Sequence, residues 1–141
     1  MSLAEIHQAI PHRGPMLLID EIVERSENRI VCRKTFRAEE FFFQGHYPDY
    51  PLVPGVILVE AAMQAGAVLV SHVPLAGGVP VATRVNDVKF KKMIRPGDVI
   101  TIDVKLDERL ADTFFMSAKV TCEGKTAATF SFAVTAAPPV G

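Results

Sequence analysis

Alternating apolar and polar residues run through the second half of the chain and predict β-strands. In segment 98–110, every second residue is apolar, at Ile100, Ile102, Val104 and Leu106. A period of two puts these side chains on one face of a strand and the intervening polar ones on the other. Further strand candidates are 81–93, 113–122 and 126–135. Strands of this kind form an antiparallel sheet with one face packed on the core and the other more exposed to solvent.

The first third of the chain predicts a short helix followed by a hairpin. Residues 3–10 are amphipathic and stop before Pro11, which cannot continue a helix. Segments 16–25 and 28–37 are rich in Ile, Val and Leu and predict two strands joined by a turn. The connection that follows, 38–54, is irregular, and loops of this length inside a compact domain are usually functional.

Residues 56–72 predict the longest helix, about five turns, with Pro54 in its first turn. This helix is apolar nearly all round, so one sheet face cannot account for its burial. A curved sheet covers one side, and a second copy of the chain is the simplest cover for the other. We therefore expect an α+β protein, with about six antiparallel strands around one long central helix, that forms a homodimer.

Composition narrows the class of protein. The 141 residues are 49% hydrophobic and 22% charged, which suits one globular domain over 1–135 with a loose tail at 136–141. With a net charge of −1, the chain as a whole has no excess positive charge to attract nucleic acid. The N-terminus lacks signal-peptide features, and Glu60 interrupts the one stretch long enough to span a membrane, 52–70. Cys32 and Cys122 are expected to be buried free thiols in the cytoplasm, and they are too few for a zinc site.

Two ionisable residues stand out as candidate chemistry. His46 lies in a loop with three prolines, fourteen residues before Glu60 on the apolar helix. Burying a carboxylate is costly unless it has a partner or a task, and a His–Glu pair can move protons near neutral pH. Gln64, four residues beyond Glu60, shares its helix face and can hydrogen-bond it. A solvated His46 and a structural Glu60–Gln64 pair are the alternatives.

Gly55 adds a third element at the start of the helix. Backbone N–H groups there lack intrahelical partners, and the helix dipole is positive. Without a side chain, Gly55 lets a ligand oxygen approach these donors, where an enolate-like carbonyl is stabilised. The alternative is a glycine kept for helix packing.

These residues resemble a known signature: His46-Tyr47-Pro48, Pro51, Pro54-Gly55-Val56, Glu60-Ala61 and Gln64. The pattern is similar to that of the 3-hydroxyacyl-acyl-carrier-protein dehydratases of bacterial fatty-acid synthesis, the FabZ type. Two flanking pieces extend the resemblance over nearly the whole chain: Pro11-His12-Arg13 with 17–20, and 88–91 with 96–98. Tyr47 in place of Phe is a mild departure, while Met93 and Arg95 are larger ones that bear on substrate preference.

The resemblance implies a hot-dog fold, a strongly bent antiparallel sheet wrapped round a central helix. It implies an active site shared by two subunits, with His46 from one and Glu60 from the other, in dimers that often assemble into hexamers. His46 removes the α-proton of a (3R)-3-hydroxyacyl thioester, Glu60 assists loss of the hydroxyl as water, and a trans-2-enoyl thioester results. The expected substrate-binding residues are Pro54, Gly55, Val56 and Gln64. No metal or cofactor is expected, because the phosphopantetheine arm of acyl carrier protein delivers the substrate.

Other hypotheses for the function remain open. A hot-dog thioesterase and a non-catalytic acyl-binding domain share the expected fold. The chain also resembles a sister dehydratase-isomerase type that has Asp at this place, so the resemblance implies that Glu60 favours dehydration without isomerisation, although some members with Glu also isomerise. The basic run Lys89, Lys91, Lys92 and Arg95 is either solvated surface or a docking site for the acidic carrier. We interpret His12, Arg13 and His72 as structural, the first two in a loop near the site entrance.

Overall fold

The computed structural model describes residues 3–47, 49–73 and 79–137, so Pro48 of the signature lies outside the described residues. The elements in chain order are α1 (Leu3–Ala9), β1 (Glu21–Arg25), β2 (Arg29–Thr35), a 3-10 turn (Phe41–Phe43), α2 (Gly55–Leu69), β3 (Val79–Phe90), β4 (Val99–Leu110), β5 (Thr113–Cys122) and β6 (Lys125–Ala137). The predicted α+β class is confirmed.

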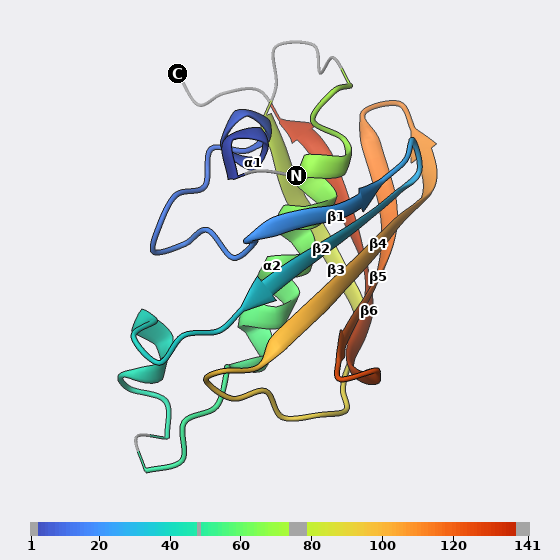
Figure 1. The fold of residues 1–141 in the computed structure, drawn as a ribbon. Helices are drawn as coiled ribbons and strands as arrows, with labels where there is room; N and C mark the ends of the chain where they lie inside the picture. The colour runs from blue at the N-terminus through green and yellow to red at the C-terminus, as the bar shows by residue number, and fades with distance from the viewer. Residues whose placement is uncertain (1–2, 48, 74–78, 138–141) are drawn as a thin grey trace.

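One six-stranded sheet, in the order β1-β2-β4-β5-β6-β3, curls about α2 (Figure 1). All the pairings are antiparallel. β3 comes directly after α2 in the chain but lies at the far edge of the sheet, where β6 is its only partner among the described strands. This order places the central helix between the two ends of the sheet.

The core forms where the apolar faces of the strands meet α2. The predicted alternation is confirmed in β4, where Ile100, Ile102 and Val104 are fully buried. The helix packs against β2, β3, β4, β5 and β6. Its buried residues include Leu58, Ala61, Ala62, Ala65, Val68 and Leu69. The small alanines let the sheet backbone approach the helix closely.

The segment 16–20 is not a strand, contrary to prediction. Its Leu18 N–H donates to the side chain of Gln64 on α2 at 2.8 Å, and Met16 C=O accepts from the same side chain. These backbone groups therefore bond the helix instead of a neighbouring strand, and β1 begins only at Glu21.

Further boundaries differ from prediction. β2 spans Arg29–Thr35 rather than 28–37, and β3 spans Val79–Phe90 rather than 81–93. α2 ends at Leu69 rather than at His72, and the Arg25 guanidinium donates to the Val68 carbonyl at 2.7 Å, satisfying an orphan C=O at the helix end. β6 continues to Ala137, so Ala136 belongs to the sheet, opposite Pro80. The expected tail therefore overlaps β6, and residues 138–141 lie outside the described residues.

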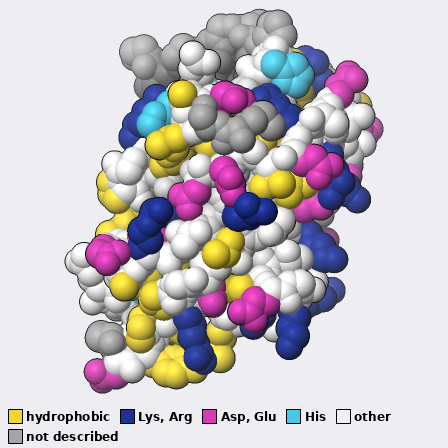
Figure 2. Space-filling model, viewed as in Figure 1, with side chains coloured by type: hydrophobic (Ala, Val, Ile, Leu, Met, Phe, Trp, Pro, Cys, Tyr) yellow, Lys and Arg dark blue, Asp and Glu magenta, His cyan; other side chains and the backbone are white. Residues whose placement is uncertain are grey.

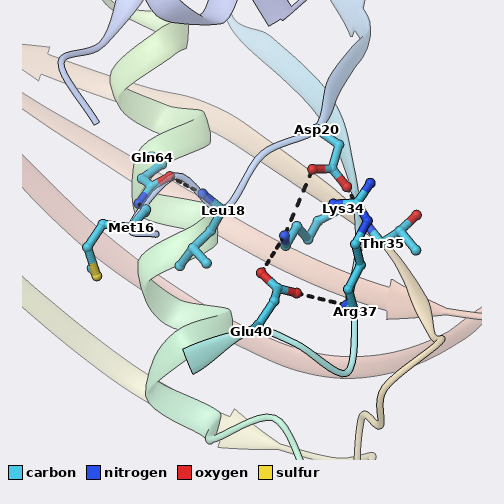
Figure 3. A network of polar contacts seen from close by, with 8 residues as sticks. All are labelled: Met16, Leu18, Asp20, Lys34, Thr35, Arg37, Glu40 and Gln64. Atoms are coloured by element: carbon cyan, nitrogen blue, oxygen red, sulfur yellow. Dashed lines mark hydrogen bonds and ion pairs between the residues drawn. The ribbon is translucent and has the colours of Figure 1, made fainter. Parts of the chain in front are cut away.

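A buried ion network fixes the connection that leads to His46 (Figure 3). Lys34 on β2 is 3% exposed and lies 2.7 Å from Glu40 and 3.9 Å from Asp20. Glu40 also accepts the Arg37 N–H, and Asp20 accepts the Thr35 N–H. A buried ammonium needs such partners, because one left unpaired would be strongly destabilising. The pairing anchors residues 37–40 just before the 3-10 turn.

The two cysteines are buried free thiols, as predicted. Burial raises the pKa of Cys32 to about 12 and also raises the pKa of Cys122. Because the thiolate is the reactive form, both groups are chemically quiet near neutral pH.

The surface fits the near-zero net charge. On the face seen in Figure 2, acidic and basic side chains are interspersed among small apolar areas. Within the described ranges, no helix has the length and hydropathy needed to cross a membrane.

Gly66 on α2 provides a test of the packing between helix and sheet. A Cβ there would lie 2.7 Å from the Phe132 ring and 2.9 Å from the Met116 sulfur, both in the buried core. We expect Gly66→Ala to lower the free energy of unfolding by about 1–3 kcal/mol through overpacking, measured by urea denaturation. Gly45→Ala is the matched control, because its Cβ would meet nothing within 4 Å. Equal stability of the two variants would contradict this close packing.

Candidate active site

His46 is held in one tautomer by the loop around it. Its Nδ1 lies 3.0 Å from the carbonyl oxygen of Leu52. A carbonyl only accepts, so Nδ1 carries the hydrogen and Nε2 keeps its lone pair. Tyr47 packs edge-on against the imidazole, with ring centroids 4.7 Å apart. The arrangement presents Nε2 as a base.

His46 lines a pocket of about 480 Å³ at the N-terminal end of α2. The pocket also includes Pro54, Gly55 and Val56, so three of the four predicted substrate-binding residues lie beside His46. Pro54 is the N-cap residue and not part of the first turn. The Val53 N–H donates to the Ile94 carbonyl at 2.8 Å and ties the loop to the segment after β3.

Glycine is required at position 55 because the Phe90 ring lies close to the backbone there. A Cβ on Gly55 would lie 2.8 Å from two ring carbons of Phe90, which also lines the pocket. Gly55 and Phe90 line the pocket together with His46, at the end of α2 where backbone N–H groups lack intrahelical partners. These donors suit a carbonyl oxygen that gains negative charge.

Glu60 lies further along α2, in a different pocket. That pocket, of about 100 Å³, also includes His12, Met63, Gln64 and Ala67, together with Pro80, Ala82 and Val134 from the outer strands. The predicted Glu60–Gln64 contact is confirmed, with Gln64 Nε2 donating to Glu60 Oε2 at 2.9 Å. The Glu60 side chain is 30% exposed, so the carboxylate is accessible but not fully solvated.

Gln64 is 1% exposed and joins Glu60 to the N-terminal segment, and Figure 3 shows its contacts with Met16 and Leu18. Its amide nitrogen also donates to Met16 O at 2.7 Å, and its oxygen accepts the Leu18 N–H at 2.8 Å. Both amide hydrogens are therefore used inside the chain. This fixed geometry makes Gln64 a support for the Glu60 carboxylate.

His12 lies near the same carboxylate, a contact that nothing in the sequence predicts beyond the place of His12 in the Pro-His-Arg piece. Its Nε2 lies 3.7 Å from Glu60 Oε2. Arg13 is structural, as interpreted, because its guanidinium donates to the carbonyls of His7, Ile10 and His12.

One chain does not bring His46 and Glu60 together. They line separate pockets, and no contact joins them among the described residues. Gly55 and Glu60 are five residues apart on α2, which is about 7.5 Å along the helix axis. Within the described part of the chain, no group of three or more His, Cys, Asp or Glu side chains could hold a metal ion.

A basic groove borders the His46 pocket. It measures about 680 Å³ and is lined by Phe90, Lys91, Lys92, Met93, Arg95 and Asp98. The two spaces share Phe90, Lys92 and Met93. Arg95 lies 4.6 Å from the centre of the Tyr50 ring and hydrogen-bonds the Tyr50 hydroxyl. The groove therefore places positively charged side chains at the entrance of the His46 pocket.

Solved structures place the chain in the hot-dog fold class. "The Dehydratase Heterocomplex ApeI:P from Xenorhabdus doucetiae" aligns with a TM-score of 0.77 at 17% identity, over 94% of this chain and 90% of that one. A hypothetical thioesterase protein with coenzyme A from Streptococcus pneumoniae aligns with a TM-score of 0.65 at 15% identity, over 86% and 90%. At these identities the likeness concerns the fold alone.

Sequence comparison then gives the family. A model of the FabA-like domain matches residues 10–131. A 3-hydroxyacyl-[acyl-carrier-protein] dehydratase FabZ of Oenococcus oeni is 42% identical over 129 residues, 90% of this chain and 93% of its own. One of Clostridium perfringens is 40% identical over 128 residues, 90% and 92%. The chain therefore belongs to the FabA-like family, among the FabZ dehydratases that its signature resembles.

The Gln64 support can be tested by stability. Gln64→Leu keeps the size of the side chain but leaves the buried Leu18 N–H without its acceptor. We expect a loss of about 1–3 kcal/mol in the free energy of unfolding, measured by urea denaturation. Gln8→Leu on the exposed side of α1 is the matched control and should change little. An unchanged unfolding midpoint for Gln64→Leu would contradict the role assigned to this amide.

Proposed function

We propose that this protein converts (3R)-3-hydroxyacyl thioesters on acyl carrier protein to trans-2-enoyl thioesters in fatty acid biosynthesis. The observation that carries the proposal is the His46 imidazole. Its Nδ1–H is held by Leu52 O, and its basic Nε2 shares a pocket with the N-terminus of α2. Membership of the FabZ group supports the same reaction. Two buried, unpaired thiols accord with a cytoplasmic enzyme.

The chemistry follows from the positions of the groups. The thioester carbonyl accepts from the Gly55 N–H, which stabilises negative charge on its oxygen and makes the α-hydrogen more acidic. His46 Nε2 takes this proton, the Cα–Cβ double bond forms, and the Cβ–O bond breaks. Glu60, protonated at this stage, gives its proton to the departing hydroxyl, which leaves as water. A proton passing from His46 to Glu60 restores the enzyme. The elimination is redox-neutral and needs no cofactor beyond the carrier's arm.

We propose further that a second copy of the chain completes the site. β3 has one open edge, and its apolar side chains are exposed: Val81 39%, Val85 40%, Val88 36% and Phe90 53%. Val56, on the face of α2 near Glu60, is 70% exposed. An exposed apolar edge strand is suited to pair with another strand. A two-fold axis beside β3 and this helix face brings His46 of one copy toward Glu60 of the other.

The basic groove supports acyl carrier protein as the partner. Carrier proteins are acidic, and Lys91, Lys92 and Arg95 line the groove that adjoins the His46 pocket. A carrier docked there directs its phosphopantetheine arm past Phe90 and Met93 toward Gly55. Electrostatic complementarity of this kind raises the association rate and sets specificity.

His46→Ala and Glu60→Gln test the acid–base pair. Each should lower turnover at least about 100-fold in the hydration of a crotonyl thioester, followed by loss of enoyl absorbance. A chromogenic disulfide assay for free thiol runs in parallel, because thiol release would indicate thioester hydrolysis instead. Near-normal turnover in either variant removes that residue from the mechanism.

A mixed dimer sharpens this test. When His46→Ala and Glu60→Gln chains are combined, each heterodimer has one site with both groups intact and should show about half the parent turnover, so an equal, random mixture should recover about a quarter. If both groups act within one chain, mixing restores nothing. Light scattering provides the assembly state, as twice or six times the 15.4 kDa chain mass.

Charge reversal tests the carrier docking site. The double variant Lys91→Glu/Lys92→Glu should raise KM for a carrier-bound substrate about tenfold or more, because like charges then face each other. Its kinetics with a short pantetheine thioester should match the parent enzyme. Lys105→Glu, on the exposed side of β4, is the control. An equal rise in KM for both substrates would place the effect in the pocket and not at the carrier.

A further inference from the structure

Glu60 faces an imidazole from the segment that follows α1. Nε2 of His12 lies 3.7 Å from Glu60 Oε2, and the two side chains are 33% and 30% exposed. Both residues line the same pocket with Gln64. This contact joins positions 12 and 60, on elements that only the fold brings together.

The buried ring nitrogen of His12 bears on the tautomer of the imidazole. Nδ1 is buried and has no hydrogen-bond partner among the described residues. An N–H in that position would be an unsatisfied buried donor, at a cost of about 1–3 kcal/mol. The tautomer that avoids this unsatisfied donor carries its hydrogen on Nε2, the nitrogen that faces Glu60.

The contacts on Glu60 are one-sided. Gln64 Nε2 at 2.9 Å and His12 Nε2 at 3.7 Å both approach Oε2. Among the described residues, no hydrogen bond or ion pair involves Oε1. Two N–H groups directed at one oxygen orient the carboxyl plane and leave the other oxygen open to a substrate.

The position of His12 is itself fixed. The Arg13 guanidinium donates to His12 O at 2.7 Å, and to Ile10 O and His7 O at 2.9 Å. The backbone around His12 is thereby bound to the end of α1. A rigid support of this kind is what an orienting group requires.

We propose that His12 is a positioning residue for Glu60 in the dehydration reaction. Its Nε2–H directs a dipole at Oε2 across a distance longer than a hydrogen bond. With Gln64, it keeps Oε1 aimed at the 3-hydroxyl of the substrate. The proposal rests on the proposed function, because it assigns His12 a task through Glu60.

Two substitutions at position 12 test this role in the crotonyl hydration assay. His12→Phe keeps a ring of similar size and removes the N–H, so kcat should fall about tenfold while KM stays within about twofold. His12→Gln returns an N–H near the place of Nε2 and should recover most of kcat. His72→Phe, an exposed position beyond α2, is the matched control and should behave as the parent.

A double variant separates this inference from the proposed function. If His12 acts through Glu60, adding His12→Phe to Glu60→Gln should cause no further loss of turnover. A parent-like kcat in His12→Phe overturns the role of His12, whereas the mechanism stands or falls with His46→Ala and Glu60→Gln alone. Equal losses of kcat in His12→Phe and His12→Gln, with lower melting temperatures in both, would make His12 purely structural and also overturn the inference.

Discussion

The structure depends on covering a helix that is apolar nearly all round. The sheet buries the side of α2 that carries its alanines, while Val56, Val59 and Met63 are only partly covered or exposed. Glu60 lies on this less covered side, four residues from Val56 and three from Met63. The face of α2 that still needs to be covered is therefore also the face that carries the single carboxylate of the helix. A second copy that meets the first requirement also closes a water-poor space around the carboxylate.

The N-terminal segment shows how a buried polar group determines local structure. Gln64 is inside the protein, so its amide must find partners, and the backbone of residues 16–18 provides them. Those backbone groups are then unavailable to the sheet, which is why β1 starts late despite a sequence that favours a strand. The same segment places His12 beside Glu60. One polar side chain thus links the edge of the fold to the candidate site.

The two candidate catalytic groups depend on different supports. His46 belongs to a loop anchored by the buried Lys34 pairs before it and by the Val53–Ile94 bond after it. Glu60 belongs to the rigid helix and is held through Gln64. Glu60 is on the same helix whose N-terminal end, with its backbone N–H groups, lines the His46 pocket. In the proposed dimer, one helix therefore provides the acid of one site and the carbonyl-binding N–H groups of the other.

The sequence by itself determined the strands with a period of two, the long helix, the buried thiols and the Glu60–Gln64 contact, because these follow from local periodicity and from spacing along one helix. It failed at residues 16–20 and at the ends of α2 and β6, and it did not predict the contact between His12 and Glu60. Hydrogen bonds and ion contacts between distant segments decide those places, as with Leu18 and Gln64 or His12 and Glu60. The local sequence does not predict which distant group will hydrogen-bond a buried amide or lie beside a carboxylate. Only the tertiary structure decides that, since it sets the distances between segments that the chain keeps far apart.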